Sequence, residues 1–124
     1  ARAYTESEAR RIAALRDFTR TLRQDGPVVL WGAGAKGVTF AQLIDPGREL
    51  IARVVDVNPM KQGRYLPGTG HEICGPERLT ESETHTALVL NPNYFSEISA
   101  TVKELRGAIT PIDVMAHLGE YACN

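Results

Sequence analysis

The first quarter of the chain carries apolar side chains at helical spacing. Residues Thr5 to Glu8 read Thr-Glu-Ser-Glu, which is typical of a capping box that satisfies free backbone N–H groups where a helix starts. Gly26-Pro27 is a strong signal for the end of a helix. The apolar positions between these signals are Ile12, Leu15, Phe18 and Leu22. Their spacing of three and four residues predicts one amphipathic helix.

Beyond Pro27 the chain alternates between short apolar runs and stretches with helical spacing. Continuous apolar runs bounded by turn residues are typical of strands buried in a parallel sheet. The last strand should lie at an edge of the sheet, because Pro111 has no N–H to donate to a neighbour. We expect strands at 28–31, 50–55, 71–74, 86–90 and 108–115.

Helices are expected between these strands. One carries apolar residues from Val38 to Ile44, a short one starts at Pro76, and a third is capped by Asn93 and runs to Leu105. Strands that alternate with helices predict an α/β fold. We expect a Rossmann-like three-layer domain with about five mostly parallel strands, an order such as 3-2-1-4-5, and an additional N-terminal helix.

The turn after the first expected strand is rich in glycine. Residues 32–37 read Gly-Ala-Gly-Ala-Lys-Gly, a G-x-G-x-x-G pattern. In such turns the first glycine allows the tight turn, the second lets a phosphate approach, and the third lets helix and strand pack closely. Asp56 stands where an acidic residue would hold a ribose hydroxyl. The pattern favours nucleotide binding, but it also suits a tight turn that binds no ligand.

Lys36 stands in the first turn of the helix that follows this loop. A cation there is unfavourable beside the positive end of the helix dipole, and a bound anion would reverse that effect. The alternative is a lysine whose ammonium simply extends into solvent.

Residues 57–70 form a long polar segment where a short connection is normal. Long irregular loops in small domains often carry function. The segment contains several side chains able to bind a polar ligand: Asn58, Lys61, Gln62, Arg64 and Tyr65.

Composition and charge exclude several classes of protein. The net charge of −1 argues against a nucleic-acid partner, and apart from the first helix the basic residues are not gathered on one segment. No apolar run reaches the roughly 18 residues of a membrane span. Cys74 and Cys123 lack metal-ligand spacing, so we expect no metal, two free thiols and a cytoplasmic protein. The three scattered histidines, including His71, suggest surface or capping roles rather than catalysis.

Four segments in this order resemble a known family: WGAGAKGVTF, VVDVNPMKQGRYLPGT, PERL and LVLNPNYFSEI. They resemble the C-terminal domain of bacterial S-adenosylmethionine-dependent nucleotide-sugar C-methyltransferases, over roughly residues 27–114. The segment after Asp56 is the most specific part. One departure concerns a Leu-Pro-Trp-Asn motif usual after the fourth strand, where this chain keeps the Asn at Asn93 but has Pro92 in place of Trp.

The resemblance implies a larger enzyme in which one domain binds the methyl donor and another binds the sugar nucleotide. S-adenosylmethionine and the catalytic residues belong to an upstream domain of the same polypeptide, and no catalytic residue, metal or cofactor is expected in this chain. Residues 1–26 would be a linker helix that packs on the domain, and 27–124 the Rossmann-like C-terminal domain that positions a keto-deoxysugar nucleotide. Lys36, Lys61 and Arg64 would neutralise the diphosphate, Asp56 or Asn58 would accept from hydroxyls, and Tyr65 would stack on a ring.

The expected substrate-binding set has twelve members: Gly32, Gly34, Ala35, Lys36, Gly37, Asp56, Asn58, Lys61, Gln62, Arg64, Tyr65 and Asn93. Two alternatives stay open. The chain could be a stand-alone module that binds NAD(P) or another nucleotide, or a scaffold domain that binds nothing.

Overall fold

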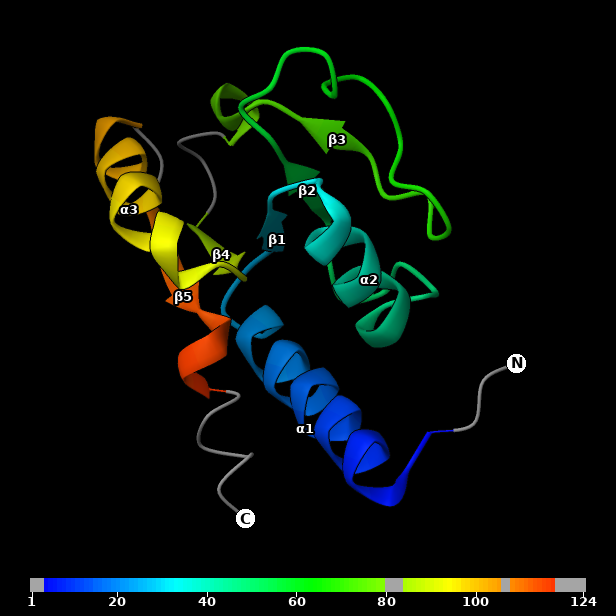
Figure 1. Ribbon diagram of the computed structural model, residues 1–124. Coiled ribbons are helices and arrows are strands. Elements are labelled where there is room, and N and C mark those ends of the chain that lie inside the picture. Colours follow the sequence, from blue (N-terminus) through cyan, green and yellow to red (C-terminus); the bar gives the residue numbers. More distant parts are fainter. Residues whose placement is uncertain (1–3, 80–83, 106–107, 118–124) are drawn as a thin grey trace.

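The computed structural model describes residues 4–79, 84–105 and 108–117 of the 124-residue chain (Figure 1). The helices are α1 (Glu6–Arg23), α2 (Ala35–Ile44) and α3 (Phe95–Glu104), with short 3₁₀ helices η1 (Pro76–Arg78) and η2 (Pro92–Tyr94). The strands are β1 (Val28–Trp31), β2 (Arg53–Val55), β3 (Ile73–Cys74), β4 (Thr84–Val89) and β5 (Ala108–Asp113). Cys123, one of the two cysteines, lies outside the described residues.

The five strands form one sheet in the order β3-β2-β1-β4-β5, with every neighbouring pair parallel. This confirms the Rossmann-like order and places β5, with Pro111, at an edge. The chain moves outward from β1 to β3 and then returns to the other side of β1 as β4. The switch point, where ligands bind in open α/β sheets, therefore lies at the carboxyl ends of β1 and β4.

Two apolar layers cover the sheet because its strand residues alternate between faces. Val28 and Leu30 pack in one core cluster with residues of α1 and α2, whereas Val29 and Trp31 pack in a second cluster with residues of α3. Helices therefore lie on both faces of the sheet, as Figure 1 shows. The expected three-layer architecture is confirmed.

Helix α1 is part of the packed domain. Its capping box forms as expected, with Glu8 N–H donating to Thr5 Oγ1 and Glu8 Oε1 accepting from Thr5 N–H. Leu15 is buried in the core. The Arg16 guanidinium donates to the carbonyl oxygens of Leu43 at 2.8 Å and Ile44 at 3.3 Å, and so satisfies free carbonyls at the end of α2.

Some element boundaries differ from expectation. β2 begins at Arg53, although Leu50 and Ile51 before it are buried. β5 ends at Asp113, and residues 114–117 are helical rather than extended.

The expected cap of α3 at Asn93 is wrong. Asn93 lies within η2, and it is the side chain of Asn91 that caps that short helix by accepting from Asn93 N–H at 3.0 Å. The side-chain cap forms one helix earlier because Pro92 starts a separate 3₁₀ turn there.

Candidate functional site

The glycine loop between β1 and α2 uses its three glycines in different ways. Gly32 has a φ of +118°, a conformation that side chains rarely adopt. Gly37 packs directly on the carbonyl group of Gly32, which leaves no room for a Cβ. Gly34 has open space where a Cβ would stand, at the point where α2 starts. The first and third glycines are therefore needed for the fold, whereas the second leaves the loop accessible.

Asp56, at the end of β2, binds the glycine loop itself. Its Oδ2 accepts from Ala33 N–H at 2.8 Å, and its Oδ1 accepts from Asn58 N–H at 2.8 Å. A ribose role for Asp56 stays a prediction, but the carboxylate also has a structural role that the sequence did not reveal. Loss of ligand binding in an Asp56 variant would therefore not distinguish contact with a nucleotide from a displaced loop.

The segment after Asp56 folds back onto the same loop. Lys61 Nζ donates to Ala33 O at 3.3 Å, and Gln62 Nε2 donates to Asp56 O at 2.8 Å. Asn58 Oδ1 accepts from Met60 N–H at 3.0 Å in a local turn. The structure thus brings Asn58, Lys61 and Gln62 to the carboxyl edge of the sheet, beside the glycine loop.

Lys36 is exposed in the first turn of α2. The N–H groups of a first helical turn have no partner inside the helix, and no side chain caps this end of α2. Among the described residues Lys36 forms no ion pair, and the first turn holds no acidic residue to offset its charge. The start of α2 is thus electrostatically suited to an anion, but anion binding by Lys36 stays a prediction, and so does the alternative of an ammonium that extends into solvent.

Within the described part of the chain, Arg64, Tyr65 and Asn93 form no hydrogen bond with the glycine loop. Arg64 and Tyr65 are exposed, and Tyr65 pairs with Glu72 and lines a hollow together with Arg48, among others. No residue of the glycine loop lines that hollow. Asn93 is exposed in η2. Ligand contacts by these three residues stay predictions.

Two hollows adjoin the glycine loop, one on each face of the sheet. One of about 300 Å³ lies at the switch point, and its lining includes Trp31, Gly32, Asp56, Tyr94 and Glu97. The other, of about 510 Å³, lies between α1 and α2 and is mainly apolar. Sequence reasoning did not assign Tyr94 to the site, although its position just after Asn93 in the family-like segment was a usable signal.

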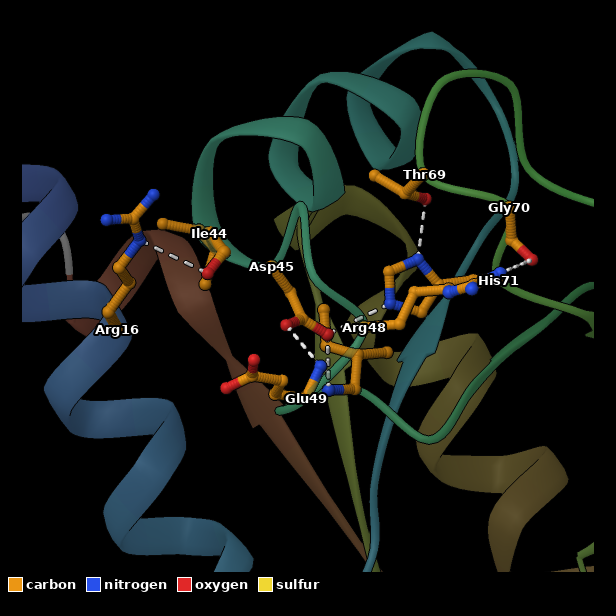
Figure 2. Close-up of polar contacts among 9 residues, drawn as sticks. Arg16, Ile44, Asp45, Arg48, Glu49, Thr69, Gly70 and His71 are labelled. Carbon is orange, nitrogen blue, oxygen red and sulfur yellow. Dashed lines mark hydrogen bonds and ion pairs between the residues drawn. The ribbon is translucent and has the colours of Figure 1, made fainter.

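A buried polar network holds the far end of α2 to the long loop, as Figure 2 shows. His71 Nε2 lies 2.9 Å from Asp45 Oδ2, and His71 Nδ1 lies 2.6 Å from Thr69 Oγ1. An ionised carboxylate only accepts, so Nε2 donates to Asp45, and in a neutral ring Nδ1 accepts from the Thr69 hydroxyl. The suggested surface or capping role of His71 is wrong, because its side chain is buried. No short motif connects Asp45 with His71 in the sequence.

The Asp45 carboxylate receives several donors at once. Burial raises the pKa of Asp45, but hydrogen bonds from Ile51 N–H, the His71 ring and Glu49 N–H outweigh it, and the net pKa is below its usual value. Asp45 therefore joins the end of α2, the segment before β2 and the loop before β3.

This lowered pKa predicts a loss of stability in acid. The contribution of ionised Asp45 is fully present above the pKa of an unfolded aspartate, about 3.9, and is lost as the pH falls through the lower pKa of the folded state. We expect the difference in Tm between the wild type and Asp45→Asn, followed by circular dichroism from pH 7 to pH 2.5, to shrink below about pH 4. A difference that stays constant down to pH 2.5 would contradict this assignment.

Other chemistry is sparse in the described part of the chain. The residues described include no cluster of three or more His, Cys, Asp or Glu side chains that could hold a metal ion. Burial raises the pKa of the Cys74 thiol, which is free and buried, so it is a poor nucleophile. None of the described helices combines the length and the apolar character that crossing a membrane requires.

The sheet order, the two helical layers and the glycine loop define a Rossmann-like α/β domain. The chain matches the family described as "C-methyltransferase C-terminal domain" over residues 2–111, and it belongs to that family. It is also similar to the C-methyltransferase NovU of Streptomyces niveus, with 32% identity over 93 residues. That match covers 74% of this chain and 22% of NovU, so the chain spans about a fifth of the relative's length. The resemblance to C-methyltransferases stated from the sequence is confirmed.

Proposed function

We propose that this chain is the nucleotide-sugar-binding domain of an S-adenosylmethionine-dependent sugar C-methyltransferase. By this proposal it positions a keto-deoxysugar nucleotide for an upstream catalytic domain of the same polypeptide. Methyl transfer to carbon requires removal of the proton next to a carbonyl, and the productive orientation of the substrate contributes much to such reactions. In this proposal the chain orients the substrate for the reaction. The methyl donor belongs to the upstream domain, and no residue here is assigned to it.

The observation that carries the proposal is the start of α2. Gly34 leaves open space there, Lys36 adds a positive charge, and Lys61 is held beside the loop by its bond to Ala33 O. A diphosphate would meet the free N–H groups of the first turn and two ammonium groups. The switch-point hollow opens beside the same loop, so a ligand that reached both would have its phosphates and its sugar in adjacent places.

The proposal predicts that thymidine diphosphate and its glucose conjugate bind and raise the Tm of the chain. At a ligand concentration 100 times the Kd, the stabilisation would be about 2.7 kcal/mol, or roughly 10 °C. Lys36→Met should weaken both ligands about tenfold or more, since a hydrogen bond to a charged group contributes about 1.5–3 kcal/mol. Isothermal titration calorimetry would measure the Kd values.

Lys103→Met is the matched control, because Lys103 is an exposed lysine in the last turn of α3. It should leave both Kd values within about twofold of the wild type. Equal effects of the two lysine variants, or the absence of binding by the wild type, would contradict the proposal. Binding of NAD or NADH without binding of thymidine diphosphate would favour the stand-alone dinucleotide module instead.

A further inference from the structure

The hollow at the switch point lies between the glycine loop and α3. Trp31 at the end of β1, Gly32 in the loop and Asp56 at the end of β2 line one side. Tyr94, Glu97 and Thr101 line the side of α3. Its volume of about 300 Å³ is at the lower limit of the roughly 300–1,000 Å³ typical of small-molecule sites. The hollow can therefore hold one ring of a ligand rather than a whole nucleotide-sugar.

The charges in this hollow are all negative. Its lining includes the carboxylates of Asp56 and Glu97 and contains neither Lys nor Arg. Two carboxylates repel a phosphate, and ionised carboxylates accept hydrogen bonds but cannot donate them. The lining therefore disfavours a phosphate and suits a ligand rich in hydrogen-bond donors, such as a sugar with its hydroxyl groups.

Glu97 is the carboxylate free to act on such a ligand. Its side chain is exposed, and among the described residues it forms no ion pair. Asp56 already accepts two backbone N–H groups, whereas the Thr101 hydroxyl donates to the backbone oxygen of Glu97 and leaves its carboxylate unused.

Aromatic side chains supply an apolar surface next to these acceptors. Tyr94 is 54% exposed, which is high for a large aromatic residue. Trp31 is 8% exposed. Both line the hollow. An aromatic ring offers a flat apolar face, and the C–H face of a sugar ring is its natural counterpart.

We infer that the switch-point hollow is a sugar subsite, in which Glu97 accepts from hydroxyl groups and Tyr94 packs on the ring. The inference rests on the proposed function and adds to it the place of the sugar and the residues that select it. The ring that enters is either the sugar attached to the diphosphate or the ribose of the nucleoside. Both rings carry hydroxyl groups and a face that can pack on Tyr94, and the experiment distinguishes them.

The test compares the Kd values of thymidine diphosphate and thymidine-diphosphate glucose for the 124-residue chain and its variants. Glu97→Gln keeps the size of the side chain and removes the charge, and Tyr94→Ala removes the ring while Tyr94→Phe keeps it. We expect Glu97→Gln and Tyr94→Ala to weaken binding about tenfold, and Tyr94→Phe to stay within about threefold. A loss confined to the glucose conjugate places the attached sugar in the hollow, whereas an equal loss for both ligands places the ribose there.

Glu104→Gln is the matched control, because it makes the same change at an exposed position of α3 outside the hollow. It should leave both Kd values unchanged within about twofold. If the wild type binds and Lys36→Met weakens binding while Glu97→Gln and Tyr94→Ala have no effect, the sugar subsite is wrong and the proposed function stands. If the wild type binds neither ligand, both are wrong.

Discussion

Replacement of Gly37 by alanine is expected to lower the free energy of unfolding by about 3 kcal/mol or more, at the upper end of overpacking effects. The new Cβ would press into the carbonyl oxygen of Gly32, with the carbonyl carbon only 3.3 Å away. Both are backbone atoms, so the clash is relieved only if α2 moves away from β1. Thermal unfolding followed by circular dichroism should show a fall in Tm of roughly 10 °C or more.

Gly34→Ala is the matched control for this prediction, three residues away in the same loop. Gly34 has a φ of −81°, which any residue adopts, and an added Cβ meets nothing within 4 Å. We expect a change below about 1 kcal/mol, and a gain in stability is compatible with the smaller entropy of the unfolded chain. Equal losses in the two variants would contradict the different roles assigned to the two glycines.

Removal of the Asp45 side chain by Asp45→Ala should lower the free energy of unfolding by about 3 kcal/mol or more, since each buried donor left without an acceptor costs about 1–3 kcal/mol. The backbone N–H groups of Glu49 and Ile51 and the ring of His71 would each lose an acceptor. Buried donors left without an acceptor account for most of the stability lost in such a change. Urea unfolding would measure the effect as a lower midpoint at an unchanged m value.

Asp45→Asn refines this test, since its side chain keeps one accepting oxygen and should lose less stability than alanine does. Asp17→Ala is the control at an exposed site, where the aspartate pairs with Arg20 on the surface of α1. Exposed ion pairs contribute little, so the midpoint should hardly move. A loss at Asp45 no larger than that at Asp17 would contradict the structural importance of the network.

Much of the fold could be predicted from local pattern. The capping box at Thr5, the β1 run and the order of the strands were all expected, because each depends on neighbouring residues or on general rules of chain connection. The different roles of Gly32 and Gly37 in the turn also followed from their spacing. The candidate site was predicted in part. Lys36 and the segment around Lys61 do lie at the glycine loop.

The rest of the site depends on which distant residues meet. Tyr65 was expected to stack on a ring of the ligand. In the structure its backbone pairs with Glu72 and the residue lines another hollow, so its contact with a ligand stays a prediction. Tyr94 enters the candidate site because η2 and α3 follow the strand next to β1 in the sheet. Separation in the sequence does not determine which residues meet in space, because the crossovers of a parallel sheet bring separate segments to one edge.

By itself, the sequence determined the class of fold, the position of the glycine loop and the family resemblance, because helical and strand periodicity, turn residues and motif order are all local properties of the chain. Only the tertiary structure decided that Asp56 binds Ala33 and that Asp45, His71 and Thr69 form one buried network. It also decided that Tyr94 and Glu97 line one hollow with Gly32. These contacts join side chains far apart in sequence, and burial makes each polar group take the partner that the packed core places beside it.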